Sequence, residues 1–331
     1  MKAIRLHQHG GPENLRFEEI PTPSVLPGHI LVAVKATSVN PIDTKVRARH
    51  LPFSQPLPAT LHGDFAGVVE KVGAGVDAFS PGDRVYGCAG GIAGTPGGAL
   101  AQYILADADL TARMPKNFSF EEAAALPLVA LTSWEALVEK LQVTPGANLL
   151  VHGGMGGVGH IAAQLGKALG ARVHTTVSNA EDAALSKHYG ADISINYKTT
   201  SAEEYTKQFT DGRGFDFVFD TVGGPNLQNS FKACRYNGSI ACSATGGSHD
   251  LTPMYVKGIS LKSVLMLIPM ITGEDRSRHG KILEQIARLA EEGKIRPHLH
   301  GERFDWTRIA QAHALLESGA QKGKITVTIG N

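Results

Sequence analysis

Three glycines in the middle of the chain have the spacing that binds the phosphates of a dinucleotide. Gly154, Gly156 and Gly159 form the pattern G-x-G-x-x-G. In such a turn one glycine allows a tight bend, one lets the backbone approach a pyrophosphate, and one lets the following helix pack closely on its strand. The N-terminus of that helix presents free N–H groups and a partial positive charge to the phosphates. The spacing therefore predicts a dinucleotide site at residues 154–159.

The segments around this turn have the context that the pattern requires. An apolar strand is expected at Leu149–Val151, and a helix is expected after the glycines because apolar residues recur there at helical spacing. A second β-prone run, Arg172–Val177, completes a βαβ unit, which distinguishes a nucleotide turn from a glycine-rich connection. The predicted contacts of the turn with the cofactor are those of Gly154, Met155, Gly156, Gly157, Val158 and Gly159.

After the turn, β-prone runs alternate with helical segments, which predicts a parallel sheet covered by helices on both faces. The expected strands are Arg172–Val177, Ile193–Asn196, Asp216–Asp220, Gly238–Ser243 and Ile259–Ile268. In such a doubly wound Rossmann domain the ligand lies beyond the carboxyl ends of the strands. Val222 and Ala244 fall at two of these ends, so we predict that both contact the cofactor.

The first 115 residues are predicted to consist of β-structure without helices. Short β-prone runs at Ile30–Ala36, Gly67–Val72, Asp83–Tyr86 and Ala101–Leu105 are separated by turns that contain proline or glycine, which favours a small barrel or sandwich. A helix is expected to follow the capping box that starts at Ser119 and to break or kink at Pro127. The chain as a whole is therefore predicted to be an α/β protein.

Composition limits the classes of function. The chain has 331 residues, of which 32 are basic and 31 acidic, so no charged surface for nucleic acid is expected. Three scattered cysteines are too few for a disulfide framework, which favours a reducing compartment. The chain shows no apolar run of signal-peptide length near its start and no apolar stretch of 18 residues. We expect a cytoplasmic protein that does not bind membranes.

The chain resembles the medium-chain dehydrogenase/reductase superfamily, and within it the zinc-independent quinone oxidoreductase branch. The matching segments are Ser38–Asp43, His62–Val69, Val72–Val76, Pro81–Val85, Gly98–Tyr103, Ala123–Pro127, the glycine turn, Gly190–Asp192, Ile195–Tyr197 and Gly323–Ile325. The resemblance implies a GroES-like catalytic domain at residues 1–124 and 276–331 and a Rossmann domain at residues 125–275. It also implies a homodimer or tetramer, with the apolar segment Leu261–Ile268 extending the sheet across subunits.

The resemblance bears on metal binding as well. Zinc-dependent relatives have a cysteine at the position of Asn40 and Gly-His-Glu at the positions of His62–Asp64. The position of their third ligand lies near Leu128, which is apolar here. A catalytic zinc needs three protein ligands and an open position, so we predict no metal site.

Without a strong Lewis acid, oxidation of an unactivated alcohol is disfavoured. Hydride transfer from a reduced nicotinamide to a quinone or an α,β-unsaturated carbonyl needs less help. The resemblance places Asn40 and Thr132 at the nicotinamide, and Asp43 is either the cap of its own loop or a direct participant. His62 is either a proton donor or part of the pocket wall. The predicted catalytic residues are Asn40, Asp43 and His62.

The predicted cofactor is NADPH, with NADH as the alternative. The second strand ends in Val177-Ser178-Asn179 instead of the carboxylate that binds the ribose hydroxyl of NAD. Relatives often have lysine where this chain has Asp182, which we interpret as a helix N-terminal residue. The residues expected at the 2′-phosphate are Ser178, Asn179, Tyr197 and Lys322.

Three hypotheses for function follow. The first is a zinc-independent, NADPH-dependent reductase of quinones or enones. The second is a nucleotide-binding protein with a mainly non-catalytic role, since the glycine turn would serve both. The third, for which the sequence offers less support, is an alcohol dehydrogenase.

Overall fold

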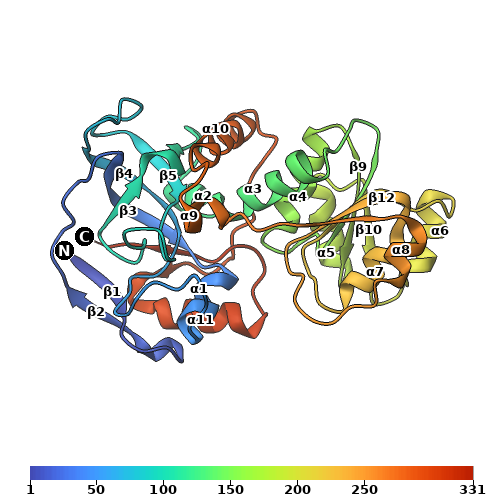
Figure 1. Cartoon of the computed structure of the whole chain (residues 1–331), viewed down its shortest axis with the longest axis horizontal. Helices are drawn as coiled ribbons and strands as arrows, with labels where there is room; N and C mark the ends of the chain where they lie inside the picture. The colour runs from blue at the N-terminus through green and yellow to red at the C-terminus, as the bar shows by residue number, and fades with distance from the viewer. Residues whose placement is uncertain (331) are drawn as a thin grey trace. The chain divides into compact units, whose positions relative to one another are not determined.

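The computed structural model describes residues 1–330, which form two compact units (Figure 1). Unit 1 comprises residues 1–128, 267–293 and those from 297 onward, and unit 2 comprises residues 129–266 and 294–296. Unit 1 is rich in β-structure and unit 2 is built on a parallel sheet, so the predicted α/β class is confirmed. No helix within residues 1–330 has the length and apolar character needed to cross a membrane.

Unit 1 is organised around a sheet of seven strands. The strands of the unit are β1 (Lys2–Leu6), β2 (Leu15–Glu19), β3 (His29–Ser38), β4 (Asp64–Val72), β5 (Arg84–Cys88), β6 (Tyr103–Asp107), β7 (Thr111–Arg113), β14 (Phe304–Asp305) and β15 (Thr326–Thr328). The order is β14-β15-β3-β4-β5-β7, and β6 also pairs with β3. The long strand β3 therefore connects segments from both ends of the chain, because β15 pairs with its last residues.

Short helices cover unit 1, and three of them lie within residues 1–115, so the prediction of β-structure alone for this segment was wrong. They are η1 (Pro12–Asn14), α1 (Pro41–Ala48), η2 (Ala108–Leu110), α2 (Phe120–Ala124), α9 (Ile268–Thr272), α10 (Ser277–Glu291), η4 (Trp306–Arg308) and α11 (Ile309–Ser318). The predicted capping box precedes α2, where the Ser119 N–H donates to Glu122 and the Glu122 N–H donates to Ser119. The helix ends at Ala124 and the next, α3 (Pro127–Trp134), begins at Pro127, so the predicted break is confirmed.

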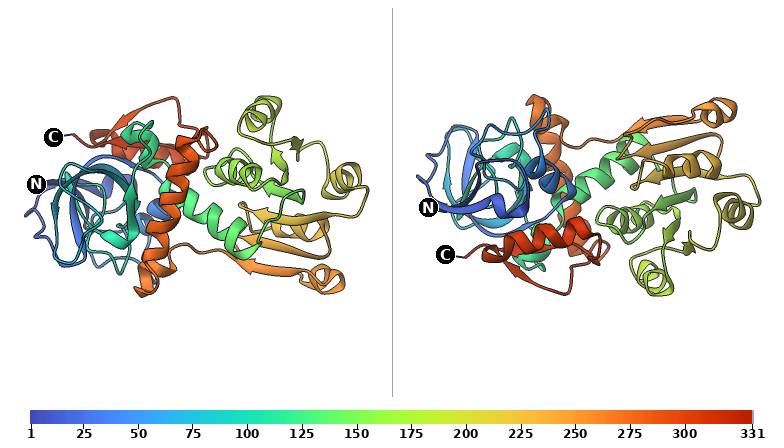
Figure 2. Two further views of the ribbon diagram at one scale, coloured as in Figure 1. Left: turned by 90° about the horizontal axis from the view of Figure 1, so that it is seen from above. Right: turned by 90° about the horizontal axis from the view of Figure 1, so that it is seen from below.

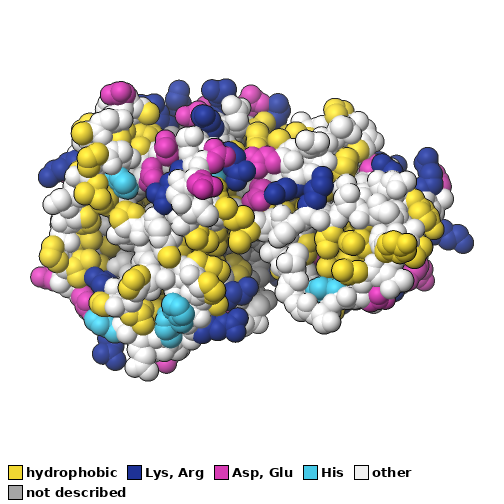
Figure 3. Space-filling view, viewed as in Figure 1, with side chains coloured by type: hydrophobic (Ala, Val, Ile, Leu, Met, Phe, Trp, Pro, Cys, Tyr) yellow, Lys and Arg dark blue, Asp and Glu magenta, His cyan; other side chains and the backbone are white. Residues whose placement is uncertain are grey.

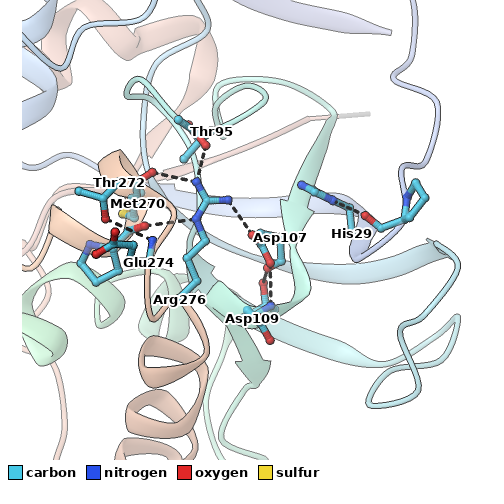
Figure 4. Close-up of polar contacts among 12 residues, drawn as sticks. His29, Thr95, Asp107, Asp109, Met270, Thr272, Glu274 and Arg276 are labelled. Carbon is cyan, nitrogen blue, oxygen red and sulfur yellow. Dashed lines mark hydrogen bonds and ion pairs between the residues drawn. The ribbon is translucent and has the colours of Figure 1, made fainter.

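Arg276 fastens the segment before α10 to the sheet of unit 1 (Figure 4). Its guanidinium donates to the Asp107 carboxylate at 2.8 Å, at the end of β6. The same group donates to the carbonyls of Gly94 at 2.7 Å and Met270 at 2.9 Å. Hydrogen bonds to a charged donor are stronger than neutral ones. Arg276 thus holds three separate segments of unit 1 together.

Unit 2 contains a six-stranded parallel sheet. Its strands are β8 (Asn148–His152), β9 (Arg172–Val177), β10 (Ile193–Asn196), β11 (Phe215–Asp220), β12 (Cys234–Cys242) and β13 (Ser260–Ser263). The order is β10-β9-β8-β11-β12-β13, so the direction of winding reverses between β8 and β11. In open parallel sheets ligands bind at this point of reversal, beyond the carboxyl ends of the strands.

Helices lie on both faces of this sheet (Figure 2). They are α3, the π-helical turn η3 (Glu135–Lys140), α4 (Gly159–Ala168), α5 (Ala180–His188), α6 (Ala202–Thr210), α7 (Asn226–Ala233) and α8 (Thr252–Lys257). Apolar residues from strands and helices, among them Leu150, Phe215, Phe231 and Ile240, form a fully buried core. The doubly wound Rossmann fold predicted from the alternation of strands and helices is confirmed.

The last predicted strand of unit 2 was too long. It was expected to run from Ile259 to Ile268, but β13 ends at Ser263. Val264 and Met266 are buried although they lie outside any strand, so burial alone explains their apolar character. Pro269 then occupies the first turn of α9, a position for which its fixed φ is suited.

Candidate functional site

The glycine turn of unit 2 connects β8 to α4, as predicted. Its first residues are fixed by β9, because the Gly153 N–H donates to the Thr176 hydroxyl at 3.0 Å and the Gly154 N–H donates to the Thr176 carbonyl at 2.9 Å. Helix α4 begins at Gly159, so its free N–H groups face the turn. The turn therefore has the geometry of an anion site at a helix N-terminus.

The three glycines of the motif have different surroundings. A Cβ added to Gly159 would lie 2.1 Å from the Gly153 carbonyl oxygen, and one added to Gly154 would lie 2.4 Å from the side chain of Thr175. A Cβ on exposed Gly156 would meet only the Gly153 oxygen, at 3.2 Å. Two glycines are therefore required by the packing of the turn itself, whereas Gly156 is exposed and has one close neighbour, so a pyrophosphate can approach its backbone. The residues present fit a dinucleotide.

Loops after the next two strands complete this edge of unit 2. A Cβ on Gly153 would lie 3.2 Å from the Val222 side chain, and the Gly224 N–H donates to the Ala244 carbonyl at 3.2 Å. The structure thus brings the glycine turn, Val222 and Ala244 together, at the point where winding reverses. Their contacts with a cofactor stay a prediction.

Asp220 shapes the loop that carries Val222. This carboxylate has no exposed surface and accepts hydrogen bonds from the N–H groups of Val222 and Gly223, at 3.0 and 2.8 Å. It also accepts from the Asn226 amide at 3.1 Å and the Ser230 hydroxyl at 2.8 Å. All four donors lie within ten residues of Asp220, so the loop is held by local contacts.

The residues predicted at the 2′-phosphate have an acidic partner. The Asp182 carboxylate accepts from the Ser178 hydroxyl at 2.9 Å and from the Asn179 amide at 2.7 Å. Asn179 in turn caps α5, since its side-chain oxygen accepts from the Asp182 N–H at 2.8 Å. Asp182 therefore is a helix N-terminal residue, but it also engages the two polar side chains that were expected to bind phosphate.

The remaining residues predicted at the cofactor are spread over both units. Tyr197, just after β10, is 55% exposed. Thr132 lies buried on α3 in unit 2, and Lys322 belongs to unit 1. Their parts in cofactor binding stay predictions.

A buried polar cluster in unit 1 surrounds Asn40, the residue before α1. The Asn40 amide nitrogen donates to the Asp64 carboxylate at 2.8 Å, and its amide oxygen accepts from the Lys324 ammonium at 2.5 Å. The Asp64 carboxylate also accepts from the Ser38 hydroxyl at 2.8 Å and the Leu128 N–H at 2.9 Å. We call Asn40, Asp43, Asp64 and Lys324 the Asn40 centre.

Lys324 is the member of the Asn40 centre that the sequence alone did not indicate. Its side chain is 4% exposed and its ammonium lies 3.9 Å from the Asp64 carboxylate. Burial lowers the pKa of Lys324, while the nearby carboxylates of Asp64 and Asp43 oppose this shift. Gly323 has φ +83°, and a Cβ there would lie 2.6 Å from the His298 carbonyl oxygen. Gly323 and Lys324 belong to a segment that matches the family, but nothing in the sequence placed Lys324 beside Asn40.

Asp43 caps the loop after Asn40. Its carboxylate accepts the Asn40 N–H at 2.7 Å, which supports the interpretation of Asp43 as a local cap. Burial raises its pKa to about 7, helped by the charge of Asp64 and opposed by the Asn40 N–H and Lys324. A direct role in a reaction stays a prediction.

Both ring nitrogens of His62 have partners. The Thr37 hydroxyl donates to the Asp64 carbonyl, so His62 Nδ1, 3.1 Å from that hydroxyl, must carry the proton and donate to it. His62 Nε2 then accepts from His313 Nε2, at 2.8 Å. Burial lowers the pKa of both rings, that of His313 to about 3. In this arrangement His62 is a neutral and fully buried side chain. Both alternatives for His62, donation of a proton and a place in the pocket wall, stay predictions.

Sequence comparison places these features among known proteins. Residues 26–116 match the profile of the alcohol dehydrogenase GroES-like domain, and residues 189–327 match that of the zinc-binding dehydrogenase family. A solved alcohol dehydrogenase superfamily protein from Novosphingobium aromaticivorans is 36% identical, with a TM-score of 0.94 and 100% of each chain covered. The rat quinone oxidoreductase is 28% identical over 99% of this chain and 98% of its own length.

The chain belongs to the medium-chain dehydrogenase/reductase superfamily, in its quinone oxidoreductase branch. Among solved members of the branch, the Escherichia coli quinone oxidoreductase complexed with NADPH is 29% identical, with a TM-score of 0.87 over 99% of this chain and 100% of that one. Family membership identifies this chain as an oxidoreductase of the quinone oxidoreductase type, and its similarity to an NADPH complex supports NADP(H) binding.

The donor set of this superfamily member around Asn40 differs from a metal site. Within residues 1–330, no three His, Cys, Asp or Glu side chains are grouped so that they could hold a metal ion. The thiol nearest to the centre is that of Cys88, and burial together with the charge of Asp64 raises its pKa well above the ordinary value. An ammonium, an amide and carboxylates instead compose the Asn40 centre.

Proposed function

We propose that this protein is a zinc-independent reductase that transfers a hydride from NADPH to a quinone or an α,β-unsaturated carbonyl. The observation that carries the proposal is the composition of the Asn40 centre, where Lys324 supplies the positive charge that faces Asp64. Such a centre can orient a polar ligand but offers no thiolate or imidazole set for a Lewis-acidic metal. A hydride acceptor that is already electron-poor has less need of a Lewis-acidic metal.

Each unit has a part in this proposal. When bound, the reduced nicotinamide supplies the hydride. In unit 2, the glycine turn and the N-terminus of α4 would hold the pyrophosphate, and Val222 and Ala244 would line the loops beside it. In unit 1, Asn40 would serve the reacting end, with the amide as a hydrogen-bond donor. We assign the role of proton source to solvent, since both nitrogens of His62 are engaged.

NADPH is the proposed cofactor, with NADH as the alternative. The absence of a carboxylate at the end of β9 and the similarity to an NADPH-bound quinone oxidoreductase favour NADPH. Asp182 favours NADH instead, because its carboxylate accepts hydrogen bonds from Ser178 and Asn179. A like charge near the 2′-phosphate weakens its binding.

We also propose that the protein is a cytoplasmic homo-oligomer. The three cysteines are unpaired and buried, which suits a reducing compartment. Strand β13 is an edge of the sheet in unit 2. The helix that precedes it in the chain, α8, carries exposed apolar side chains, including Tyr255 at 83% and Val256 at 61% (Figure 3). An unpaired strand edge is a template for pairing with a second copy.

Turnover of a small panel tests the proposed function. Metal-stripped protein is incubated with NADPH and benzoquinone, phenanthrenequinone, 2-hexenal or hexanal, and the loss of reduced nicotinamide is followed by absorbance. We expect turnover of a quinone or of 2-hexenal, and a rate with hexanal at least about tenfold lower, because the saturated aldehyde needs a Lewis acid. Binding of NADPH without any turnover would favour the non-catalytic hypothesis, and activity that requires added zinc would favour an alcohol dehydrogenase.

A further inference from the structure

Hydrogen-bond chemistry fixes the orientation of the Asn40 amide. A lysine ammonium has three donors and no acceptor, so the atom that faces Lys324 must be the amide oxygen. A carboxylate only accepts, so the atom that faces Asp64 must be the amide nitrogen. The two partners come from segments far apart in the sequence, and together they exclude the flipped amide.

In this orientation the Asn40 amide keeps one N–H group available for a ligand. Its oxygen is engaged by Lys324 and one of its two N–H groups is engaged by Asp64. The second N–H has no partner among residues 1–330. An amide held in this way can donate to an oxygen of a ligand through its second N–H. A charged donor on the amide oxygen also polarises the group and strengthens the remaining N–H as a donor.

We propose that Lys324 is a positioning residue, which holds the Asn40 amide so that its second N–H is offered to an oxygen of the acceptor or of the nicotinamide carboxamide. The inference rests on the proposed function, which assigns Asn40 to the reacting end. Lys324 itself is 4% exposed and acts through Asn40. Its ammonium also compensates the charge of Asp64, which is fully buried. Burial of a lysine is costly unless its charge is paired, so the position is specialised.

A double-mutant cycle between Asn40→Ala and Lys324→Met tests this role. We expect Lys324→Met to lower kcat at least tenfold and to change the Kd of NADPH, measured by fluorescence titration without an acceptor, less than threefold. Because Lys324 acts through Asn40, the double variant should be no slower than Asn40→Ala alone, whereas independent effects would multiply. Multiplied effects, or wild-type kcat in Lys324→Met, would overturn the inference.

Two further variants keep the test interpretable. If Lys324→Met does not fold, the double substitution Asp64→Asn and Lys324→Met takes its place in the cycle. This variant removes both charges, so neither charge is left unpaired in the interior. The control is Lys257→Met in unit 2. Within residues 1–330, the Lys257 ammonium donates only to the carbonyls of Phe231, Lys232 and Cys234. This variant should lose stability and retain kcat. A wild-type protein that reduces none of the panel would refute the proposed function itself, and that result is distinct from a failed cycle.

Discussion

Two buried carboxylates, one in each unit, are satisfied in different ways. Asp64 in unit 1 and Asp220 in unit 2 both have no exposed surface. Asp220 accepts from four neutral donors, all between residues 222 and 230. Asp64 accepts from Ser38, Asn40 and the Leu128 N–H and faces the Lys324 ammonium. One carboxylate orders a local loop, and the other joins segments from most of the length of the chain.

The two carboxylates depend on their surroundings in different ways. Loss of a neutral network leaves donors unsatisfied, whereas loss of one member of a buried ion pair leaves a charge without compensation. The loop at Asp220 therefore depends on hydrogen bonds alone. The Asn40 centre depends on the complete folding of unit 1, because β3, β4 and the segment before β15 must all be in place.

Removal of each carboxylate should give the largest contrast. We expect Asp64→Asn to lower the free energy of unfolding by about 3–5 kcal/mol, because Lys324 keeps its charge in the interior. The matched change Asp220→Asn should cost about 1–3 kcal/mol, since the donors that it leaves are neutral. Urea denaturation of both variants measures the two losses. Equal losses of unfolding free energy in the two variants would show that the Lys324 charge does not make Asp64 more important for stability than Asp220.

Asp43, which neighbours Asp64, Lys324 and Cys88, should make the stability of unit 1 depend on pH. Burial raises the pKa of Asp43 from 3.8 to about 7, so between these values the folded protein keeps a proton that the unfolded chain has lost. The unfolding free energy should therefore fall as the pH rises from 5 to 8, by at least ~1 kcal/mol from this group. Denaturation at both pH values should show a smaller fall in Asp43→Asn. The same fall in both proteins would assign the dependence to other groups.

The smallest effect is expected at the open edge of unit 2, where Asp182 is only partly buried. Replacing Asp182 by asparagine removes a negative charge beside Ser178 and Asn179. Because the repulsion between two like charges at this range is about 1 kcal/mol in water, the ratio of NADPH affinity to NADH affinity should rise by about five- to tenfold. Fluorescence titration of the reduced nucleotides measures the ratio. Glu181→Gln, which removes the same charge one residue earlier in the same helical turn, is the control and should shift the ratio less. A larger shift in Glu181→Gln would show that the overall negative charge at the start of α5, and not Asp182 in particular, determines the preference between NADPH and NADH.

The sequence predicted what depends on neighbouring residues. The glycine turn, the capping box before α2 and the strands β9 and β10 follow from short patterns, and the structure confirms them. Lys324 was missed because its contact with Asn40 joins residues 284 positions apart, which no local pattern reveals. The partnership of Asp182 with Ser178 was missed for a different reason, since a helix N-terminal acid satisfies the pattern without its side-chain contacts. The end of β13 was mistaken because buried apolar residues also occur outside strands.

Transfer of a hydride from the nicotinamide to the acceptor can be followed with an isotope. Metal-stripped protein is given NADPH that carries deuterium at both C4 positions, together with 2-hexenal, and the product is analysed by mass spectrometry. We predict a reduced product that contains one deuterium per NADPH consumed, because the nicotinamide supplies the hydride and solvent supplies the proton. Reduced product without deuterium, or no product while NADPH is bound, would contradict the account.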